Sequence, residues 1–245
     1  MQAYFFPYFG YFQLIHSVDH FCLYEHVSFR KRSWLTRNRI VDKGSRSIVN
    51  IHIPVQKQSS FKLIKEVSIS ESKDWAKSLL NLLFFNYKKA QHFEEIYSFV
   101  ETALGQDFDK LHDLNSYVIQ QICMLLDIST VITTAHDSTI ETELMEKQDL
   151  HASDTKSERI YRLCNLFGAD QYVNPTGGMD LYNYEDFQKQ NITLNFIQPA
   201  KLVYHHYGTD STAQLSIVDA LMHMGTDGLQ AELDNYKLIG KDVHL

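Results

Sequence analysis

Residues 4–12 read Tyr4-Phe5-Phe6-Pro7-Tyr8-Phe9-Gly10-Tyr11-Phe12, and seven of these nine positions are aromatic. Neither the alternation of a half-buried strand nor the spacing of a surface helix produces such a run. Two interpretations stay open: the buried start of a core, which is the commoner use of clustered aromatics, or the wall of a pocket that holds a ring. For a pocket, Gly10 would let a ligand approach the backbone, and the tyrosine hydroxyls would bind its substituents.

The hydrophobic pattern outward from this run indicates the fold class. Short strand-like runs come first, at residues 21–24, 48–55 and 63–69. From residue 74 to 127, apolar residues recur at spacings of three and four, which predicts three consecutive helices. Helices and strands then alternate, which favours an α/β sheet over a helical bundle. We therefore predict a single α/β domain over residues 1–245. It would contain a Rossmann-like mixed or parallel sheet, with residues 74–127 as a helical insertion or cap.

Composition excludes several classes of partner. The 245 residues are 44% hydrophobic and 22% charged, and the formal net charge is −7. Such a charge argues against broad coating of nucleic acid and against an anionic membrane surface. We find neither an apolar stretch long enough to span a bilayer nor a secretion signal, so we expect a cytoplasmic protein that does not insert into a membrane.

A basic run at residues 30–39 opposes this acidic balance. It reads Arg30-Lys31-Arg32-Ser33-Trp34-Leu35-Thr36-Arg37-Asn38-Arg39 and holds five cations. Guanidinium groups suit phosphate oxygens, and a tryptophan can stack on a base or a sugar. The run therefore favours a site for a diphosphate or another polyanion, with a solvated hairpin face as the alternative.

A second candidate for anion binding is the sequence Asn174-Pro175-Thr176-Gly177-Gly178. Consecutive backbone amides with few side chains in the way can bind an anion or a carboxylate. The chain has neither G-x-G-x-x-G nor G-x-x-x-x-G-K, so this is not a nucleotide fingerprint. An ordinary turn is the alternative.

Groups for proton transfer are harder to place. Glu25-His26 and His205-His206 could each supply a general base, or could be surface pairs. Asp219 follows Ser216 at the spacing of a helix capping box, which is a structural role. His16 and His20 lie one helical turn apart, but no third ligand can be named, so we predict no metal site. These motifs identify no cofactor.

Taken in order along nearly the whole chain, these motifs resemble the WbqC-like family. The segments that carry the resemblance are Gln2 to Asp19, Lys31 with Ser33-Trp34 and Arg37-Asn38-Arg39-Ile40, Arg159 to Ala169, Tyr172 to Tyr182, and Leu215 to Asp219 with Gly225. Members occur in bacterial O-antigen and surface-polysaccharide gene clusters, and a glycine-transferase role has been suggested for them. The resemblance thus implies transfer of an aminoacyl or other acyl group to an amino sugar carried on a nucleotide diphosphate. The chain departs from the family's pattern at Glu25-His26, where members tend to carry two aspartates.

We combine these observations into one hypothetical site. Its proton-transfer groups would be Glu25, His26 and Asp219. Its substrate-binding residues would be Gln2, Tyr4, Tyr8, Gly10, Tyr11, Lys31, Trp34, Arg37, Asn38, Arg159, Asn174, Gly177, Gly178 and Tyr182. The expected ligands are a sugar nucleotide and an acyl or aminoacyl donor, which could be an aminoacyl-tRNA, an adenylate or a thioester. An aminoacyl-tRNA is the one nucleic acid that this hypothesis allows.

Two other functions remain open. The first is a non-catalytic sugar-nucleotide-binding or scaffold protein of the same pathway. The second is a nucleotidyltransferase-like enzyme, because Tyr8-Phe9-Gly10-Tyr11 resembles the His-x-Gly-His entrance of class I nucleotidyltransferase-like folds with tyrosines in place of the histidines. That exchange would remove imidazolium charge from the phosphates but would leave nucleotide binding possible.

Overall fold

The computed structural model of the protein describes residues 1–25, 27–57, 62–72, 74–134, 156–206, 209–210 and 214–241. The chain divides into two compact units. Unit 1 consists of Met1–Phe12, Leu23–Ser129 and Lys201–Leu233, and unit 2 of Gln13–Cys22, Thr130–Ala200 and Asp234–Leu245. The prediction of a single domain with residues 74–127 as an insertion or cap stays a prediction. A polar connection that we expected over residues 138–154 lies outside the described residues.

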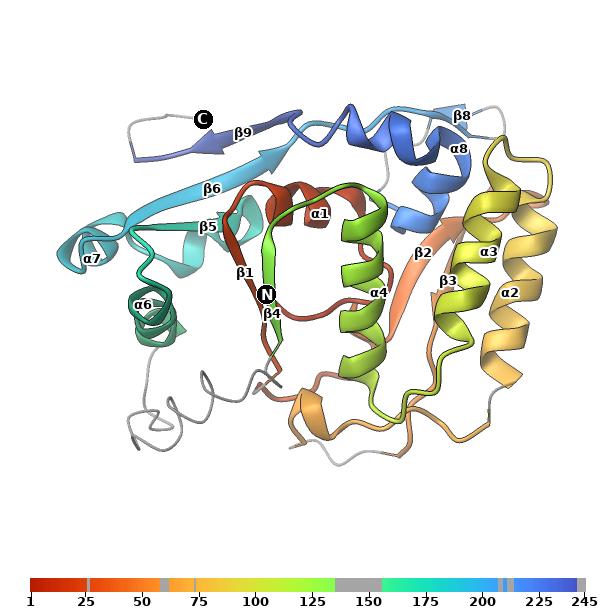
Figure 1. The fold of residues 1–245 in the computed structure, drawn as a ribbon, viewed down its shortest axis with the longest axis horizontal. Coiled ribbons are helices and arrows are strands. Elements are labelled where there is room, and N and C mark those ends of the chain that lie inside the picture. Colours follow the sequence, from red (N-terminus) through yellow and green to blue (C-terminus); the bar gives the residue numbers. More distant parts are fainter. Residues whose placement is uncertain are drawn as a thin grey trace. The chain divides into compact units, whose positions relative to one another are not determined.

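Unit 1 is built from helices and two-stranded ribbons (Figure 1). Its elements are β2 (Arg37–Val41), β3 (Ile48–His52), η1 (Ile64–Glu66), α2 (Asp74–Tyr87), α3 (Phe93–Leu104), α4 (Leu111–Leu125), β7 (His205–His206), β8 (Thr209–Asp210) and α8 (Ile217–Gln230). Two further elements, α1 (Phe9–His16) and β1 (His20–Leu23), have residues in both units. β2 pairs with β3 in antiparallel register, and β7 with β8.

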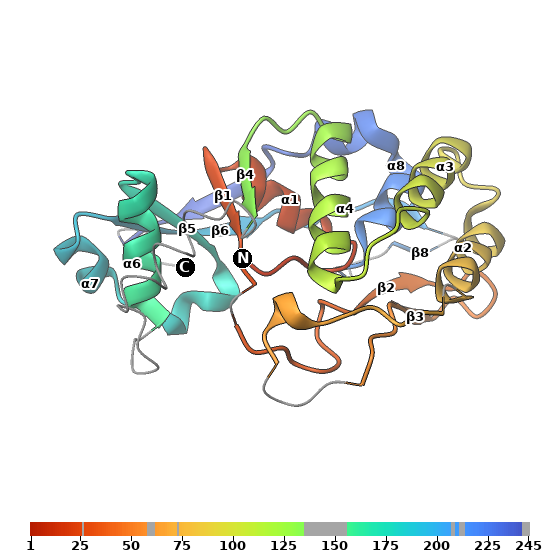
Figure 2. The same ribbon diagram turned by 60° about the horizontal axis from the view of Figure 1, so that its bottom comes forward.

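The three predicted helices are confirmed as α2, α3 and α4. Each buries the residues that recur at spacings of three and four, for example Ile96 and Val100 of α3. Figures 1 and 2 both show α2 beside α3. The buried face of α4 also carries the polar side chains His112 and Asn115, which its apolar spacing did not indicate.

One strand was not predicted, and one predicted strand was wrong. Residues 37–41, the first three of which belong to the basic run, form β2. Its inward face includes the polar Asn38, so the strand lacks the apolar alternation that identifies one. Residues 63–69, which we read as a strand, contain the single turn η1 and only isolated bridges at both ends. The carboxylate of Glu66 accepts the backbone N–H of Leu63 at 2.7 Å and closes that turn.

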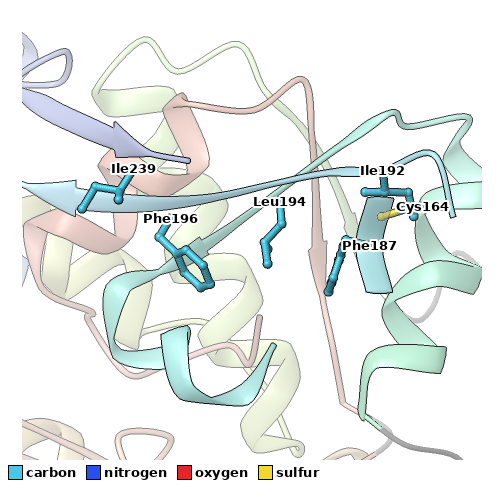
Figure 3. Close-up of a cluster of buried hydrophobic side chains, with 6 residues drawn as sticks. All are labelled: Cys164, Phe187, Ile192, Leu194, Phe196 and Ile239. Carbon is cyan, nitrogen blue, oxygen red and sulfur yellow. The ribbon is translucent and has the colours of Figure 1, made fainter. Parts of the chain in front are cut away.

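Unit 2 contains β4 (Val131–Thr134), α6 (Lys156–Phe167), β5 (Gln171–Pro175), η2 (Thr176–Leu181), α7 (Tyr184–Lys189), β6 (Thr193–Pro199) and β9 (Tyr236–Ile239). β4 pairs with β1, and a separate sheet has the order β5-β6-β9, in which β6 runs parallel to β5 and antiparallel to β9. Six buried side chains from α6, α7, β6 with its preceding residue, and β9 form the core of this unit (Figure 3). The mixed α/β class is therefore confirmed. Because the largest sheet among the described strands has three strands, a Rossmann-like arrangement is not established.

Candidate functional site

The aromatic run and the basic run lie side by side in unit 1. The backbone N–H of Phe5 donates to the carbonyl of Trp34 at 2.9 Å. The side-chain amide of Asn115, on α4, donates both to the carbonyl of Ala3 at 2.8 Å and to that of Leu35 at 2.9 Å. These bonds join the two runs through their backbones, so the residues that the sequence singled out in each run belong to one region.

The backbone of Phe6 is held in a left-handed conformation, with a φ of 40°. Non-glycine residues rarely adopt this region, and they keep it only where the surroundings fix it. Here the Phe6 carbonyl accepts the amide of Asn38 at 2.6 Å and the hydroxyl of Ser216 at 3.0 Å. Asn38 also donates to the Phe5 carbonyl at 3.0 Å. Buried Asn38, which we predicted to bind substrate, therefore fixes the path of the aromatic run into α1.

The three tyrosines of the run differ in accessibility. Tyr11 is buried, and its hydroxyl donates to the carbonyl of Gln2 at 2.8 Å. Tyr4 and Tyr8 are half-buried. Burial raises the pKa of both, and the proximity of Tyr4 raises the pKa of Tyr8 further. Tyr4 and Tyr8 are therefore protonated hydrogen-bond donors at neutral pH. Gly10 is buried in the first turn of α1.

Trp34, Arg37 and Arg39 form a cluster on the outer face of the β2–β3 ribbon, which we call the Trp34 platform. The guanidinium carbons of Arg37 and Arg39 lie 5.9 and 5.1 Å from the centre of the Trp34 ring, within the range of cation–π attraction. The tryptophan side chain is exposed, with 39% of its surface accessible. Lys31, also predicted for this site, is exposed in the preceding loop.

The two guanidinium groups of the platform lack acidic partners within the part of the chain that the structure describes. Their buried Nε atoms have no hydrogen-bond acceptor among the described residues, although Arg39 also donates through Nη2 to the carbonyl of Gln214 at 3.3 Å. Two adjacent positive charges with spare donors are a suitable environment for an anion. Arg39 was absent from the predicted site, although the same basic run contains it.

The start of α8 covers the free edge of β2 (Figure 1). The backbone N–H of Ser216 donates to the carbonyl of Arg39 at 2.8 Å. The N–H of Val41 donates to the carboxylate of Asp219 at 3.4 Å. Ser216 caps α8 by accepting the N–H of Val218 at 3.3 Å. The cap is therefore confirmed, but the carboxylate of Asp219 points to β2 and not back to the cap.

Asp219 is fully buried and lies in a polar network that the sequence did not reveal. The hydroxyl of Tyr204 donates to its Oδ1 at 2.7 Å, and the hydroxyl of buried Tyr87 donates to its Oδ2. The ring of His223 stacks on that of Tyr204 and meets that of Tyr87 edge-on. Burial, and then the charge of Asp219, raise the pKa of Tyr204. These partners come from distant parts of the chain, so no local motif could have indicated them.

Glu25 is also buried, against α4. Its Oε2 lies 3.1 Å from Nε2 of His112, which in turn lies 3.2 Å from the hydroxyl of Ser116. This buried contact between a carboxylate and an imidazole joins the segment after β1 to α4. The catalytic role of Glu25 stays a prediction, and His26 lies outside the described residues.

The remaining predicted residues belong to unit 2. Arg159 is on α6, and its Nε is buried. The side chain of Asn174 lies close to the backbone of Gly178, because a Cβ at position 178 would lie 2.0 Å from its amide nitrogen. A larger residue at position 178 would therefore require the Asn174 side chain to move. Tyr172, whose ring packs against that of Tyr182, donates to the amide oxygen of Asn174 at 3.4 Å. Gly177 is exposed, with open space around it.

A pocket in unit 1 lies away from all of these predicted residues. Its lining comes from the starts of α2 and α4 and the end of α3, and includes Trp75, Glu71, Asp107 and Phe108. No helix among the described residues is long and apolar enough to cross a membrane.

Comparison with known proteins identifies the family. The model of the WbqC-like protein family matches residues 2–231. The uncharacterized protein Rv1507c of Mycobacterium tuberculosis (strain ATCC 25618 / H37Rv) is 30% identical over 229 residues, which cover 93% of each chain. No solved structure matches the chain significantly. Because the family match extends over nearly all of the sequence, this chain belongs to the WbqC-like protein family.

Proposed function

We propose that this protein transfers an aminoacyl group, such as glycine, or a similar acyl group to an amino sugar carried on a nucleoside diphosphate, in the synthesis of surface polysaccharide. The observation that carries the proposal is the Trp34 platform, where two arginines without a described acidic partner flank an exposed tryptophan. The platform would hold the nucleotide part of the sugar nucleotide.

Charge supports this use of the platform. In a protein with a net charge of −7, two guanidinium groups against one ring repel each other, and a dianion between them would relieve the repulsion. Guanidinium groups bind phosphate oxygens in a bidentate manner, and the exposed face of Trp34 offers a surface for a base. Arg37 and Arg39 are half-buried, so less freedom is lost when a ligand orders them than for fully exposed side chains.

The reaction would form a C–N bond between the sugar amine and the acyl carbon while the bond from that carbon to the donor's leaving group breaks. A base takes the proton that the amine loses, and we retain Glu25, His26 and Asp219 as candidates. Both described carboxylates are buried: Asp219 accepts the N–H of Val41 on the strand that carries Arg39, and Glu25 lies against α4. Tyr4 and Tyr8 would orient the sugar by donating hydrogen bonds.

Several finer predictions belong to this proposal. We retain Gln2, Gly10, Tyr11, Lys31 and Asn38 as residues that line or shape the site. In unit 2, substrate binding by Arg159, Asn174, Gly177, Gly178 and Tyr182 stays a prediction. The parallel pair β5 and β6 is what a Rossmann-like sheet would contain, and a cytoplasmic location would give access to nucleotide-linked sugars.

Thermal shift with a panel of nucleoside diphosphate sugars, and with uridine diphosphate alone, tests the binding site. A ligand at 100 times its Kd adds about 2.7 kcal/mol to the free energy of unfolding and therefore raises the melting temperature. We expect the double variant Arg37→Ala with Arg39→Ala to lose this shift. The double variant Arg30→Ala with Arg32→Ala removes the same charge from the exposed loop before the platform and should keep it. Equal responses of the two variants would contradict the proposal.

Turnover separates the candidate functions. Mass spectrometry of a sugar nucleotide incubated with the protein and an activated amino acid would show the added acyl mass if the protein is a transferase. Binding without that mass would favour a scaffold or binding protein. A nucleotidyltransferase would instead release pyrophosphate from a sugar phosphate and a nucleoside triphosphate, which a coupled phosphate assay detects.

A further inference from the structure

Positive charge is concentrated in one part of the chain, which we call the basic segment, Val27–Lys65. It contains 10 of the protein's 23 lysines and arginines but only one of its 30 acidic residues, Asp42. The rest of the chain holds 13 cations and 29 acids. The acidic net charge therefore conceals a strongly positive segment, all of it in unit 1.

We propose that the basic segment binds RNA, and that the acyl donor of the proposed transfer is an aminoacyl-tRNA. The identity of the donor rests on the proposed function, whereas RNA binding by the segment does not.

The first support is the exposure of the cations. Arg30, Lys31, Arg32, Arg46 and Lys62 are all exposed, and none forms an ion pair with a carboxylate of the described residues. Phe29 donates its backbone N–H to the carbonyl of Lys62 at 2.8 Å, which places Lys62 beside the loop of Arg30. These side chains are free to meet phosphate groups, whose contacts with Lys and Arg provide most of the affinity for nucleic acid.

The second support is backbone conformation. Arg32 and Arg46 have φ values of 58° and 55°, in the left-handed region. Glycine or asparagine adopts that conformation at a lower cost in free energy. Residues stay in this region only where the surroundings fix them, so the two turns hold the backbone of Arg32 and Arg46 in a defined conformation.

The third support is the length of the ribbon over which the cations are distributed. Arg46 lies in the turn at one end of the β2–β3 ribbon, and the loop of Arg30 to Arg32 precedes the other end of β2. Five residues of β2 span ~17 Å at ~3.4 Å per residue. A nucleic-acid backbone can follow such a strip past the Trp34 platform, whereas one diphosphate is too short to do so.

The same surface fits a membrane less well. A protein that binds a bilayer surface inserts apolar side chains between the headgroups in addition to its cations. Among the described residues of the basic segment, the exposed large hydrophobic side chains are Trp34 and Ile48. Trp34 is flanked by two guanidinium groups, which leaves Ile48 as an isolated apolar group.

Fluorescence anisotropy with a labelled tRNA minihelix that ends in single-stranded CCA tests the proposal. For five phosphate contacts, raising KCl from ~50 to ~200 mM should weaken binding by ~100-fold or more. The triple variant Arg30→Ala, Arg32→Ala and Lys62→Ala should bind ~10-fold or more weakly at low salt, and the slope of log affinity against log salt should fall by about three. The control variant Lys77→Ala, Lys88→Ala and Lys89→Ala removes the same charge from exposed positions on α2 and just after its end, and it should stay within about twofold of wild type.

Each outcome decides a point. No binding of the minihelix by the wild type, or an equal loss in both triple variants, would overturn the RNA surface. Binding to vesicles of phosphatidylserine and phosphatidylcholine without binding to the minihelix would overturn it in favour of a membrane. Nucleotide-sugar binding is measured on the same samples and should survive in the Arg30, Arg32 and Lys62 variant. RNA binding without nucleotide-sugar binding would contradict the proposed function but would still support RNA binding by the basic segment.

Discussion

The two faces of β2 carry different chemistry, although their residues alternate along five positions. On the inner face, the side-chain amide of Asn38 donates hydrogen bonds to two carbonyls of the aromatic run. On the outer face, Arg37 and Arg39 flank Trp34 without a described acidic partner. Residue type alone therefore does not identify a site. Polar groups with internal partners hold the chain in place, and those that keep spare donors at the surface are candidates for binding.

The largest expected loss of stability follows from a substitution at the edge of β2. Asp219→Ala leaves the buried donors of Val41 and Tyr87 and the half-buried hydroxyl of Tyr204 without their acceptor and should lower the free energy of unfolding by about 3–5 kcal/mol. Urea denaturation measures this difference. Asp227→Ala, at an exposed position of the same helix, should change it by less than about 0.5 kcal/mol. A loss below about 1 kcal/mol for Asp219→Ala would show that the network contributes little to stability.

A smaller loss is expected on the inner face. Asn38→Ala removes the donors to the Phe5 and Phe6 carbonyls and the acceptor of the Arg39 N–H, so it should cost about 2–3 kcal/mol. Asn50→Ala is the matched control, because Asn50 is exposed and faces Arg39 across the ribbon. Denaturation curves of the two variants should therefore separate clearly. Coinciding curves would remove the distinction between the two faces.

On the outer face, stability should hardly change. Arg37→Ala removes a buried Nε that has no described acceptor, so we expect the free energy of unfolding to stay within about 0.5 kcal/mol of wild type. The same variant should lose the thermal shift with nucleotide sugars. An unfolding free energy that falls as much as that of Asn38→Ala would mean that Arg37 holds the fold, which contradicts its assignment to the platform.

The smallest expected change in stability follows from a substitution in the turn after β2. The backbone N–H and hydroxyl of Ser45 donate to the carboxylate of Asp42 at 2.7 and 2.8 Å and lower its pKa below the ordinary 3.8. A lowered pKa in the folded state adds stability above the unfolded pKa, and that stability is lost as the pH falls through the folded value. Asp42→Asn should therefore destabilise the protein slightly at pH 6 and less at pH 3. Ser45→Ala should reduce this pH-dependent difference, and equal differences at both pH values would contradict it.

The helices α2, α3 and α4 and most strands of unit 2 could be predicted from the sequence. Their apolar residues recur at regular spacings that local packing requires. β2 could not be predicted, because Asn38 occupies an inward position where the pattern calls for an apolar residue. Two of the three platform residues, Trp34 and Arg37, were predicted from the composition of the basic run. The alternation of β2 shows that Arg39, and not Asn38, shares their face. Tyr87, Tyr204 and Asn115 were missed, because each acts on a residue more than ten positions away.

The family, the mixed α/β class, the three helices and the concentration of cations near Trp34 follow from the sequence, since these depend on local spacing, composition and ordered motifs. The tertiary structure alone decided which polar residues hold the fold and which remain available. The physical reason is that a buried polar group must find a partner, and that partner can come from any part of the chain. Asp219 thus meets Tyr87 and Tyr204, whereas the guanidinium groups beside Trp34 meet no described carboxylate.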